Sequence, residues 1–491
     1  MACTLGLDIS TTATKALLLG EDGGVLGVAS SPHRLDTPRP LWSEQDPDEW
    51  WRATQASVRR VLADTGTDPQ SIKGIGLSGQ MHGLVMLNGA GKVLRPAILW
   101  NDQRSAAECD AIRDALGLER LVALTGNDAF PGFTAPKILW VRNHEPEIFA
   151  ATRHVLLPKD YIRFRLSGTL ATDRAGAGGT LLLDLRTRDW SDEVLQALEI
   201  SRDWLPPTSE GSEVNARLHP QTAASLGLPP DLPIVGGGGD QAAQAVGVGA
   251  VSPDVFALTV GTSGVVFAPC DAPTVDPRGR AHAFPHAVPG RWHVMGVMLS
   301  AAGSLQWYRD SLAPGADFDA LVQEADTVEP GCEGLAFLPY LSGERTPHAD
   351  PNARASFVGM TLSHRRGHLT RAVLEGVAFG LRDNLELLRE AGLPAPREIR
   401  ASGGALKSPV WSQILADVLD VDLVTVDATE GAALGAAILA GVGAGLWSDV
   451  DAATQASVST GRTISPKQPE AYHAAYRRFR ALYPAIASVG V

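Results

Sequence analysis

The sequence predicts an α/β protein made of two related halves with a cleft between them. Apolar strands alternate with helical segments along the chain, which is the pattern of layered α/β folds. A strand, a tight turn rich in hydroxyl side chains and a second strand occur near residue 10 and again near residue 260. A chain of 491 residues is also too long for one hydrophobic core, so we expect two domains, residues 1–247 and 248–491.

Three strands are predicted at the start of the first half. The first strand ends at Asp8, the second covers residues 16–19 and the third covers residues 25–29, after the turn signal EDGG. A helix is predicted within residues 42–66, because that stretch has an acidic first turn and ends at a glycine. The other elements expected in this half are a strand and loop over residues 72–88 and helices over residues 101–124 and 135–149.

The second half repeats the strand–turn–strand pattern. Strands over residues 255–260 and 265–268 enclose the turn Gly-Thr-Ser-Gly. A long helix is expected over residues 370–392, and a strand, a double glycine and a helix over residues 397–420. The apolar stretch 432–447 is rich in glycine and alanine and too short to span a bilayer, so it predicts a tightly packed helix.

Charge and cysteine content narrow the class of protein. The net charge of −13 does not favour nucleic acid or an anionic membrane as a partner. The four cysteines lie far apart, with neither a CxxC pair nor metal-ligand spacing, which indicates thiols in a reducing compartment. Asp8 interrupts the first apolar run, so we expect no signal peptide. We therefore expect a cytoplasmic protein.

The two hydroxyl-rich turns are candidate phosphate-binding loops. Ser10, Thr11 and Thr12 supply hydroxyl and backbone N–H groups in the first, and residues 261–264 supply them in the second. Taken alone, either turn is better explained as a plain hairpin. The P-loop and Rossmann glycine patterns are both absent in their required context, which excludes the two commonest nucleotide folds.

Two aspartates are candidates for the chemistry of phosphoryl transfer, which needs a metal ion and a base for the attacking hydroxyl. Asp8 stands at a strand end before the first loop, where a carboxylate suits Mg²⁺. Asp240 follows an apolar run and four glycines, at the expected start of a helix. A carboxylate at the position of Asp240 suits a general base. A structural role explains each aspartate equally well, because Asp8 could cap the turn that follows it and Asp240 could cap the helix.

Further candidates lie in small-residue turns. Gly404 and Ala405 are expected to open a helix after a strand, where a flat purine would fit, although a tight strand-to-helix turn is an equal explanation. His82 lies in a loop with glycines on both sides, which favours a functional role, whereas Met81 alone would predict core packing. Lys159 and Asp160 are interpreted as a solvated pair without a chemical role.

Taken together, these motifs resemble the FGGY family of carbohydrate kinases. Residues 132–144 are similar to the first signature of that family and residues 355–375 to the second, and the resemblance extends over nearly the entire chain. Within the family, the segments that resemble the xylulokinase branch are residues 41–47, 78–83, 95–102, 156–163 and 341–348.

The resemblance implies two actin-like, ribonuclease-H-like domains, an N-terminal sugar-binding one and a C-terminal nucleotide-binding one, that close over a sugar and ATP. It implies phosphorylation of D-xylulose to D-xylulose 5-phosphate, with Mg²⁺ accompanying ATP. In this sequence Asp8 matches the metal-associated carboxylate and Asp240 the general base. The positions that match the sugar site are Met81, His82, Asp240 and Gln241. The positions that match the ATP site are Thr12, Lys15, Gly261, Thr262, Ala302, Gln306, Gly404, Ala405 and Ser408.

Two departures from the family pattern leave alternatives open. Ser10 stands where the first loop commonly has glycine, and Gln241 stands where xylulokinases commonly have asparagine. Because related glycerol kinases carry glutamine there, a kinase of the same family acting on ribulose, glycerol or gluconate is the first alternative. A more remote alternative is an actin-like ATPase switch. The sequence is compatible with a homodimer but does not determine the oligomeric state.

Overall fold

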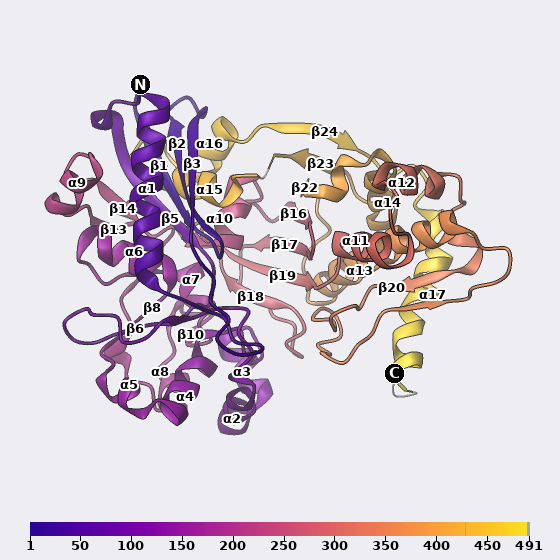
Figure 1. Ribbon diagram of the computed structural model, residues 1–491, viewed down its shortest axis with the longest axis horizontal. Helices are drawn as coiled ribbons and strands as arrows, with labels where there is room; N and C mark the ends of the chain where they lie inside the picture. The colour runs from indigo at the N-terminus through magenta and orange to yellow at the C-terminus, as the bar shows by residue number, and fades with distance from the viewer. Residues whose placement is uncertain (428, 489–491) are drawn as a thin grey trace.

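The computed structural model describes residues 1–427 and 429–488 and consists of two lobes, each built around a seven-stranded sheet. Figure 1 shows the lobes side by side, the first half of the chain in indigo and magenta and the second half in orange and yellow. The yellow helices α15 (Gly431–Gly443) and α16 (Val450–Ser457) lie with the first lobe (Figure 1). The chain therefore returns to its first lobe after building most of the second.

The first sheet begins with the three predicted strands, which are confirmed. Strand β1 (Cys3–Ile9) pairs antiparallel with β2 (Ala13–Gly20) and parallel with β5 (Ile72–Gly79). Strand β3 (Val25–Pro32) pairs antiparallel with β2, and β14 (Pro233–Val235) pairs parallel with β5. The sheet is completed by β13 (Val214–Arg217), antiparallel to β14, and by the short β15 (Gly238–Gly239), parallel to β5.

Six strands of the second sheet repeat the topology of six strands of the first. Strand β16 (Val255–Val260) pairs antiparallel with β17 (Gly264–Cys270) and parallel with β22 (Glu398–Ser402). Strand β19 (Trp292–Met298) pairs antiparallel with β17, and β23 (Leu423–Val426) pairs parallel with β22. The edges are β24 (Thr460–Ile464), antiparallel to β23, and β18 (His282–Pro285), antiparallel to β19. The repeated order confirms the predicted pair of ribonuclease-H-like halves.

Helices cover the sheets and build a subdomain below the first one (Figure 1). The first-lobe helices are α1 (Pro47–Thr65), α2 (Ala106–Leu116), α3 (Leu118–Thr125), α4 (Thr134–His144), α5 (Pro146–Ala151), α6 (Pro158–Ser167), α7 (Arg174–Gly178), α8 (Asp192–Ala197), α9 (Pro220–Leu226) and α10 (Asp240–Gly247). The second-lobe helices are α11 (Ala302–Leu312), α12 (Phe318–Asp326), α13 (Arg366–Glu390), α14 (Pro409–Leu419) and α17 (Glu470–Ala487). The helices predicted near residues 47, 101, 135 and 370 are thus confirmed, with breaks at Gly117 and Glu145.

Short strand pairs and single helical turns complete the architecture. The pairs are β4 (Glu44–Gln45) with β7 (Ala97–Ile98), β6 (Val85–Leu87) with β8 (His154–Leu156), β9 (Thr172–Asp173) with β12 (Thr208–Ser209), β10 (Leu183–Asp184) with β11 (Asp189–Trp190), and β20 (Ala336–Leu338) with β21 (Ser356–Val358). The 3₁₀ turns are η1 (Pro69–Ser71), η2 (Arg202–Trp204), η3 (Cys332–Gly334) and η4 (Gly404–Lys407).

Helix α15 packs directly on the backbone of the first sheet. A Cβ atom on Gly6 would lie 2.0 Å from the carbonyl oxygen of Ala433, and one on Gly76 would lie 1.9 Å from that of Ala436. On its other side, a Cβ on Gly435 would lie 1.8 Å from the carbonyl oxygen of Ala243 in α10. The predicted tightly packed helix is confirmed, and glycines on three elements allow the close approach.

Two expectations about composition can be compared directly with the fold. Cys3, Cys109, Cys270 and Cys332 are all buried free thiols, as predicted. Across the residues that the structure describes, no helix combines the length and the apolar character that a membrane crossing requires.

Candidate active site

The two candidate carboxylates converge at one end of the first sheet. Asp8 in β1 is in register with Ser78 in β5, and Ser78 is in register with Gly238 in β15. Asp240 follows β15 at once and is the first residue of α10, whose N-cap is Gly239 rather than Asp240. The strand register of the central sheet therefore brings together residues that are 232 positions apart in the sequence.

Burial raises the pKa of both carboxylates, and the charge of Asp8 adds to the effect at Asp240. Loss of hydration raises the pKa of Asp8 to about 6, against the opposing effect of Lys15, its cross-strand partner. Loss of hydration and the negative charge of Asp8 raise the pKa of Asp240 to about 7. A carboxyl group that titrates near neutral pH can accept a proton in a reaction and release it afterwards.

Asp8 has one carboxylate oxygen free for a ligand. Its side chain is buried, and within the described residues Oδ1 has no hydrogen-bond partner. No cluster of three or more His, Cys, Asp or Glu side chains suited to a metal ion occurs in that part of the chain. A buried carboxylate with an unpartnered oxygen fits a cation that is held by one or two carboxylates together with ligand oxygens and water, as Mg²⁺ commonly is.

The first candidate phosphate loop lies between β1 and β2. The hydroxyl of Ser10 donates to the carbonyl oxygen of Ala13 at 2.7 Å, so this side chain closes the turn instead of facing a ligand. Thr12 is exposed. Lys15 is half-buried and forms an ion pair with Glu430 at 2.9 Å, at the start of α15. The loop is thus tied to the returning helix.

The second candidate loop, between β16 and β17, is joined to the start of α11. The backbone N–H of Ala302 donates to the carbonyl oxygen of Gly261 at 2.8 Å, and that of Ala301 donates to Thr262 at 2.8 Å. This loop occupies the same place in the second sheet as residues 10–12 in the first, because β16 and β17 correspond to β1 and β2. Its tie to α11 places Gly261, Thr262 and Ala302 together.

A cavity of about 690 Å³ adjoins this second loop. Seven of the nine predicted ATP-site residues line it, namely Gly261, Thr262, Ala302, Gln306, Gly404, Ala405 and Ser408. Thr12 and Lys15 belong to the opposite loop and are not part of its lining. Sequence reasoning missed Phe318, Val322 and Val410, whose apolar side chains also line it. These three are helix residues without a motif, and only the packing of α12 and α14 brings them to the cavity.

The Gly404–Ala405 segment differs from its prediction in one respect. These residues form the single 3₁₀ turn η4 and do not open the following helix. Helix α14 begins at Pro409, and the side chain of Ser408 caps it by accepting a hydrogen bond from the N–H of Trp411 at 3.2 Å. The proline fixes the helix start, and the glycine turn before it stays open to the cavity.

Met81 packs against Gly239, the residue before Asp240, and its neighbour His82 has a different environment. Met81 is buried in the core of the lower subdomain, and a Cβ on Gly239 would lie 2.7 Å from its Cγ. His82 is half-buried and has a left-handed backbone, with φ of 68°. Its ring nitrogen Nδ1 donates to the carbonyl oxygen of Gly179 at 2.6 Å, and burial lowers its pKa to about 3. His82 is therefore neutral at pH 7.

Two side chains of α4 hold the main chain of His82. Its carbonyl oxygen accepts hydrogen bonds from the hydroxyl of Thr134 and the ammonium of Lys137, both at 3.0 Å. Lys137 also donates to the carbonyl oxygen of Gly132 at 2.7 Å, and its pKa is lowered well below the ordinary value by burial. These bonds stabilise a backbone conformation that is rare for a residue with a Cβ atom.

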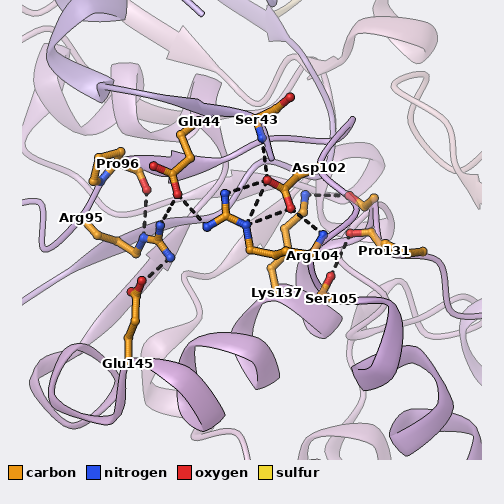
Figure 2. Close-up of polar contacts among 11 residues, drawn as sticks. Ser43, Glu44, Arg95, Pro96, Asp102, Arg104, Ser105, Pro131, Lys137 and Glu145 are labelled. Atoms are coloured by element: carbon orange, nitrogen blue, oxygen red, sulfur yellow. Dashed lines mark hydrogen bonds and ion pairs between the residues drawn. The ribbon is translucent and has the colours of Figure 1, made fainter. Parts of the chain in front are cut away.

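A buried ion network surrounds this corner of the site (Figure 2). Figure 2 shows the guanidinium of Arg104 between the carboxylates of Asp102 and Glu44, each at 2.7 Å. Arg95 also contacts Glu44 and reaches Glu145 at 3.1 Å. The network connects strands β4 and β7 with the loop that carries Trp100, whose indole N–H donates to Thr11 Oγ1 at 3.0 Å.

The predicted solvated pair, Lys159 and Asp160, is wrong. Both side chains are fully buried, and Lys159 Nζ lies 2.6 Å from Asp160 and also contacts Asp173. Asp173 accepts a hydrogen bond from the N–H of Gly176 at 2.7 Å and so caps α7, which leads to Gly179, the acceptor of His82. Two adjacent charges in a sequence look like a surface pair, but here α6 buries them under the site.

The four glycines before Asp240 fit against the protein's own backbone. Gly237 has a φ of 72°, and a Cβ there would lie 1.8 Å from the carbonyl oxygen of Leu77. A Cβ on Gly236 would lie 2.2 Å from the carbonyl oxygen of Glu210. Gln241, the residue after Asp240, is half-buried, and its N–H donates to Asp240 Oδ1 at 2.7 Å.

Comparison with known proteins extends this picture. The N-terminal domain model of the FGGY family of carbohydrate kinases matches residues 3–247, and the C-terminal domain model matches residues 256–444. The chain is 45% identical to a xylulose kinase of Escherichia coli K12, over 90% of each chain. A ligand-bound xylulose kinase from Lactobacillus acidophilus superposes with a TM-score of 0.93 at 30% identity, covering 100% of this chain and 98% of the other. A gluconokinase of Bacillus subtilis is 33% identical over 93% of this chain and 91% of its own.

Proposed function

Because this chain belongs to the FGGY family of carbohydrate kinases, we propose that it transfers the γ-phosphoryl group of ATP to D-xylulose, giving D-xylulose 5-phosphate and ADP. The observation that carries the proposal is the 45% identity, over 90% of each chain, to a xylulose kinase. The paired carboxylates and the large cavity agree with it, because phosphoryl transfer needs a base, a metal ligand and a site for ATP.

Asp240 is the general base of the proposed reaction. Its carboxylate takes the proton of the C5 hydroxyl while that oxygen attacks the γ-phosphorus, and ADP leaves with the bridging oxygen. Its pKa of about 7 supports this role, because a base is most effective when its pKa lies near the working pH.

Asp8 is the protein ligand that would hold Mg²⁺. Its buried, unpartnered Oδ1 supports this assignment. The ion would neutralise charge on the phosphate oxygens of ATP when it is bound. Asp8 also faces Lys15 across the strand pair, so the site pairs a buried anion with one nearby cation.

The cavity beside Gly261 and Thr262 is the proposed ATP site. Small residues at Gly404 and Ala405 leave room for a flat base, and Phe318, Val322 and Val410 offer apolar contacts to it. The glycine and hydroxyl groups of the loop suit phosphates, because backbone N–H groups approach an anion closely there. Thr12 and Lys15 approach the phosphates from the first lobe.

The sugar binds between Asp240 and His82 in this proposal. Neutral His82 donates through Nδ1 to Gly179, which leaves Nε2 as an acceptor for a sugar hydroxyl. Met81 packs against Gly239, the residue before Asp240, and so shapes the site. The amide of Gln241 supplies a further donor and acceptor beside the base.

A kinase acting on gluconate is the second candidate, because a gluconokinase of Bacillus subtilis is 33% identical over most of this chain. The deciding experiment measures ADP release with D-xylulose, D-ribulose, glycerol and D-gluconate, and identifies the phosphorylated product by mass spectrometry. We expect the largest kcat/KM with D-xylulose. A larger value with another substrate would overturn the proposal, and ATP hydrolysis without any sugar phosphate would favour an actin-like ATPase switch.

The setting of the enzyme is part of the same proposal. We place it in the cytoplasm, where ATP and free sugars occur together, and its partners are small molecules. A homodimer stays a prediction, which sedimentation of the purified chain would test directly.

A further inference from the structure

A second, smaller cavity lies beside His82 where the two lobes meet. Its volume is about 50 Å³, and its polar lining consists of His82 and Trp100 from the first lobe and His282 and Arg345 from the second. The remaining lining is mainly aromatic and apolar, so the few polar groups determine what it can bind. Neither His282 nor Arg345 has a role in the reaction described so far.

This cavity adjoins the proposed sugar site, because His82 belongs to both. Gly239, the residue before Asp240, packs on Met81, and His82, the residue after Met81, lines the cavity. A sugar that spans from Asp240 to His82, with its reacting hydroxyl at Asp240, places its opposite end at the cavity. For a ketose phosphorylated at C5, that end carries the C2 carbonyl and the C1 hydroxyl.

His282 presents a hydrogen-bond acceptor to this end. Its Nδ1 lies 2.9 Å from the side-chain oxygen of Asn127, whose amide nitrogen donates to the carbonyl oxygens of Thr125 and Ala283. Because these two bonds fix the orientation of the Asn127 amide, His282 Nδ1 must be the donor to its oxygen. Nε2 is then an acceptor, and this buried atom has no partner among residues 1–427 and 429–488. Burial lowers the pKa of His282 well below its ordinary value, so the ring stays neutral.

Arg345 supplies hydrogen-bond donors without another use. Within the part of the chain that the structure describes, its guanidinium makes neither a hydrogen bond nor an ion pair, and it lies 5.8 Å from the ring centre of Phe130. The lining side chains His82 and Trp100, by contrast, already donate to Gly179 and Thr11. A guanidinium donates only, so it is complementary to a carbonyl oxygen, which accepts only.

The loop that carries Arg345 is anchored firmly in the second lobe. The carboxylate of Glu344 accepts hydrogen bonds from the N–H groups of Leu299 at 3.0 Å and Arg345 at 2.8 Å. Thr346 exchanges hydrogen bonds with Val297 in β19, each at 3.1 Å. The residues before and after Arg345 are therefore fixed, and the guanidinium is held at the lobe boundary rather than in solvent.

We propose that Arg345 and His282 form a subsite that recognises the α-hydroxyketone end of the substrate. Arg345 donates to the C2 carbonyl oxygen, and the C1 hydroxyl donates to Nε2 of His282. This subsite rests on the proposed function, since it assigns the two ends of a ketose that is phosphorylated at C5. It makes the second lobe a part of sugar selection as well as of ATP binding.

The first test replaces Arg345 by methionine, which keeps much of its length and removes all donors. We expect kcat/KM for D-xylulose to fall about 10- to 100-fold, as is typical for the loss of a charged hydrogen bond. The inhibition constants of xylitol and D-arabitol, the two pentitols in which the carbonyl is reduced, should change less than about threefold, because they lack the accepting ketone. Arg345→Lys should show an intermediate loss, and the exposed Arg278→Met is the matched control.

The second test replaces His282 by phenylalanine, which keeps the ring and removes the acceptor. The wild type should have a larger kcat/KM for D-xylulose than for 1-deoxy-D-xylulose. In the variant the ratio of the two kcat/KM values should fall about fivefold or more, which is the effect of one hydrogen bond. Thermal unfolding of each variant checks that it is folded. This second pair of substrates keeps the subsite testable if Arg345→Met does not fold.

The possible outcomes separate the two proposals. A wild type that does not phosphorylate D-xylulose overturns the proposed function and the subsite together. If the wild type phosphorylates D-xylulose, two results overturn the Arg345 contact alone. In the first, Arg345→Met weakens kcat/KM for D-xylulose and the binding of the pentitols by the same factor. In the second, neither quantity changes. An unchanged preference in His282→Phe overturns the contact to the C1 hydroxyl.

Discussion

At the scale of single residues, the site depends on carboxylates whose charge is costly in the folded protein. Asp8 lies in β1 and Asp240 directly follows β15, the two strands that flank the end of β5, and the charge of Asp8 is one cause of the raised pKa of Asp240. Sites of this kind lower stability to gain reactivity, because the same burial that tunes the base penalises its charged form. Both effects can be measured.

The pH dependence of the reaction should reflect Asp240. With a pKa of about 7, the base is increasingly protonated below neutral pH, so kcat/KM should fall about tenfold per pH unit on the acidic side. Replacing Asp8 by asparagine removes a nearby negative charge and should shift the acidic limb of the pH profile of kcat/KM to lower pH, although the overall rate falls. The exposed Asp114→Asn is the control, and an unshifted limb in Asp8→Asn would contradict the coupling.

Asp240→Asn should lower turnover strongly yet stabilise the fold. The pKa of this carboxyl is about 7 in the folded state and about 4 when unfolded, so its ionised form destabilises the native state increasingly from pH 4 to 7 and fully above it. Asparagine removes that penalty. We expect turnover to fall by about 10²- to 10⁴-fold, and Tm to rise by about 1–5 °C at pH 8, with the gain shrinking towards pH 4.5. A lower Tm at pH 8 would refute the burial argument.

At the scale of elements, buried ion pairs hold loops that the sheet does not fix. The network of Glu44, Asp102 and Arg104 joins strand β4 to the loop that carries Trp100 (Figure 2). Trp42 adds to it, since the guanidinium of Arg104 lies 3.7 Å from its ring centre. Lys159 and Asp173 act in the same way below α7.

Arg104→Met should destabilise the first lobe strongly. The substitution leaves Asp102 and part of Glu44 as buried charges without a counter-ion, and the expected loss is about 3–5 kcal/mol. A lobe of this size should then lose about 6–15 °C in Tm, measured by calorimetry. Arg60→Met removes an exposed ion pair with Asp64 and should change the stability by less than about 1 kcal/mol. Similar losses in the two variants would contradict the role of the network.

At the scale of the whole molecule, two sheets that share the topology of six strands are joined by a chain that crosses back. The C-terminal segment contributes α15 to the first lobe, where it packs between the sheet and α10 (Figure 1). Lys15 of β2 is paired with Glu430 at the start of that helix, so the strand that follows the first hydroxyl-rich turn contacts the crossing segment. The boundary proposed at residue 247 therefore separates the sheets but not every helix.

Gly435→Leu tests this crossing. A side chain there would collide with the carbonyl oxygen of Ala243, since even a Cβ would lie 1.8 Å away. We expect a loss of about 3 kcal/mol or more, or about 6 °C or more in Tm. Ala432→Leu, on a half-buried position of the same helix, should cost much less. An equal loss in the two variants would mean that close packing of α15 is unimportant.

Much of the site was accessible from local patterns. The strands around both hydroxyl-rich turns, the helix start at Asp240 and the packed helix at residues 431–443 follow from periodicity, turn residues and glycine content. Phe318, Val322 and His282 could not be found in this way, because they carry no local motif and their place depends on how α12 and β18 pack. Arg345 belongs to the family-like segment 341–348, but only the packing of the loop after β20 brings it to the small cavity.

The sequence by itself determined the fold class, the two hydroxyl-rich turns and the family, because these depend on short-range patterns and on long signatures. Tertiary structure alone decided the electrostatics. Strand register brings Asp8 close to Asp240, burial raises the pKa of both, and α6 buries Lys159 with Asp173. Charge interactions depend on distance and on dielectric surroundings, and neither quantity can be obtained from the order of the residues.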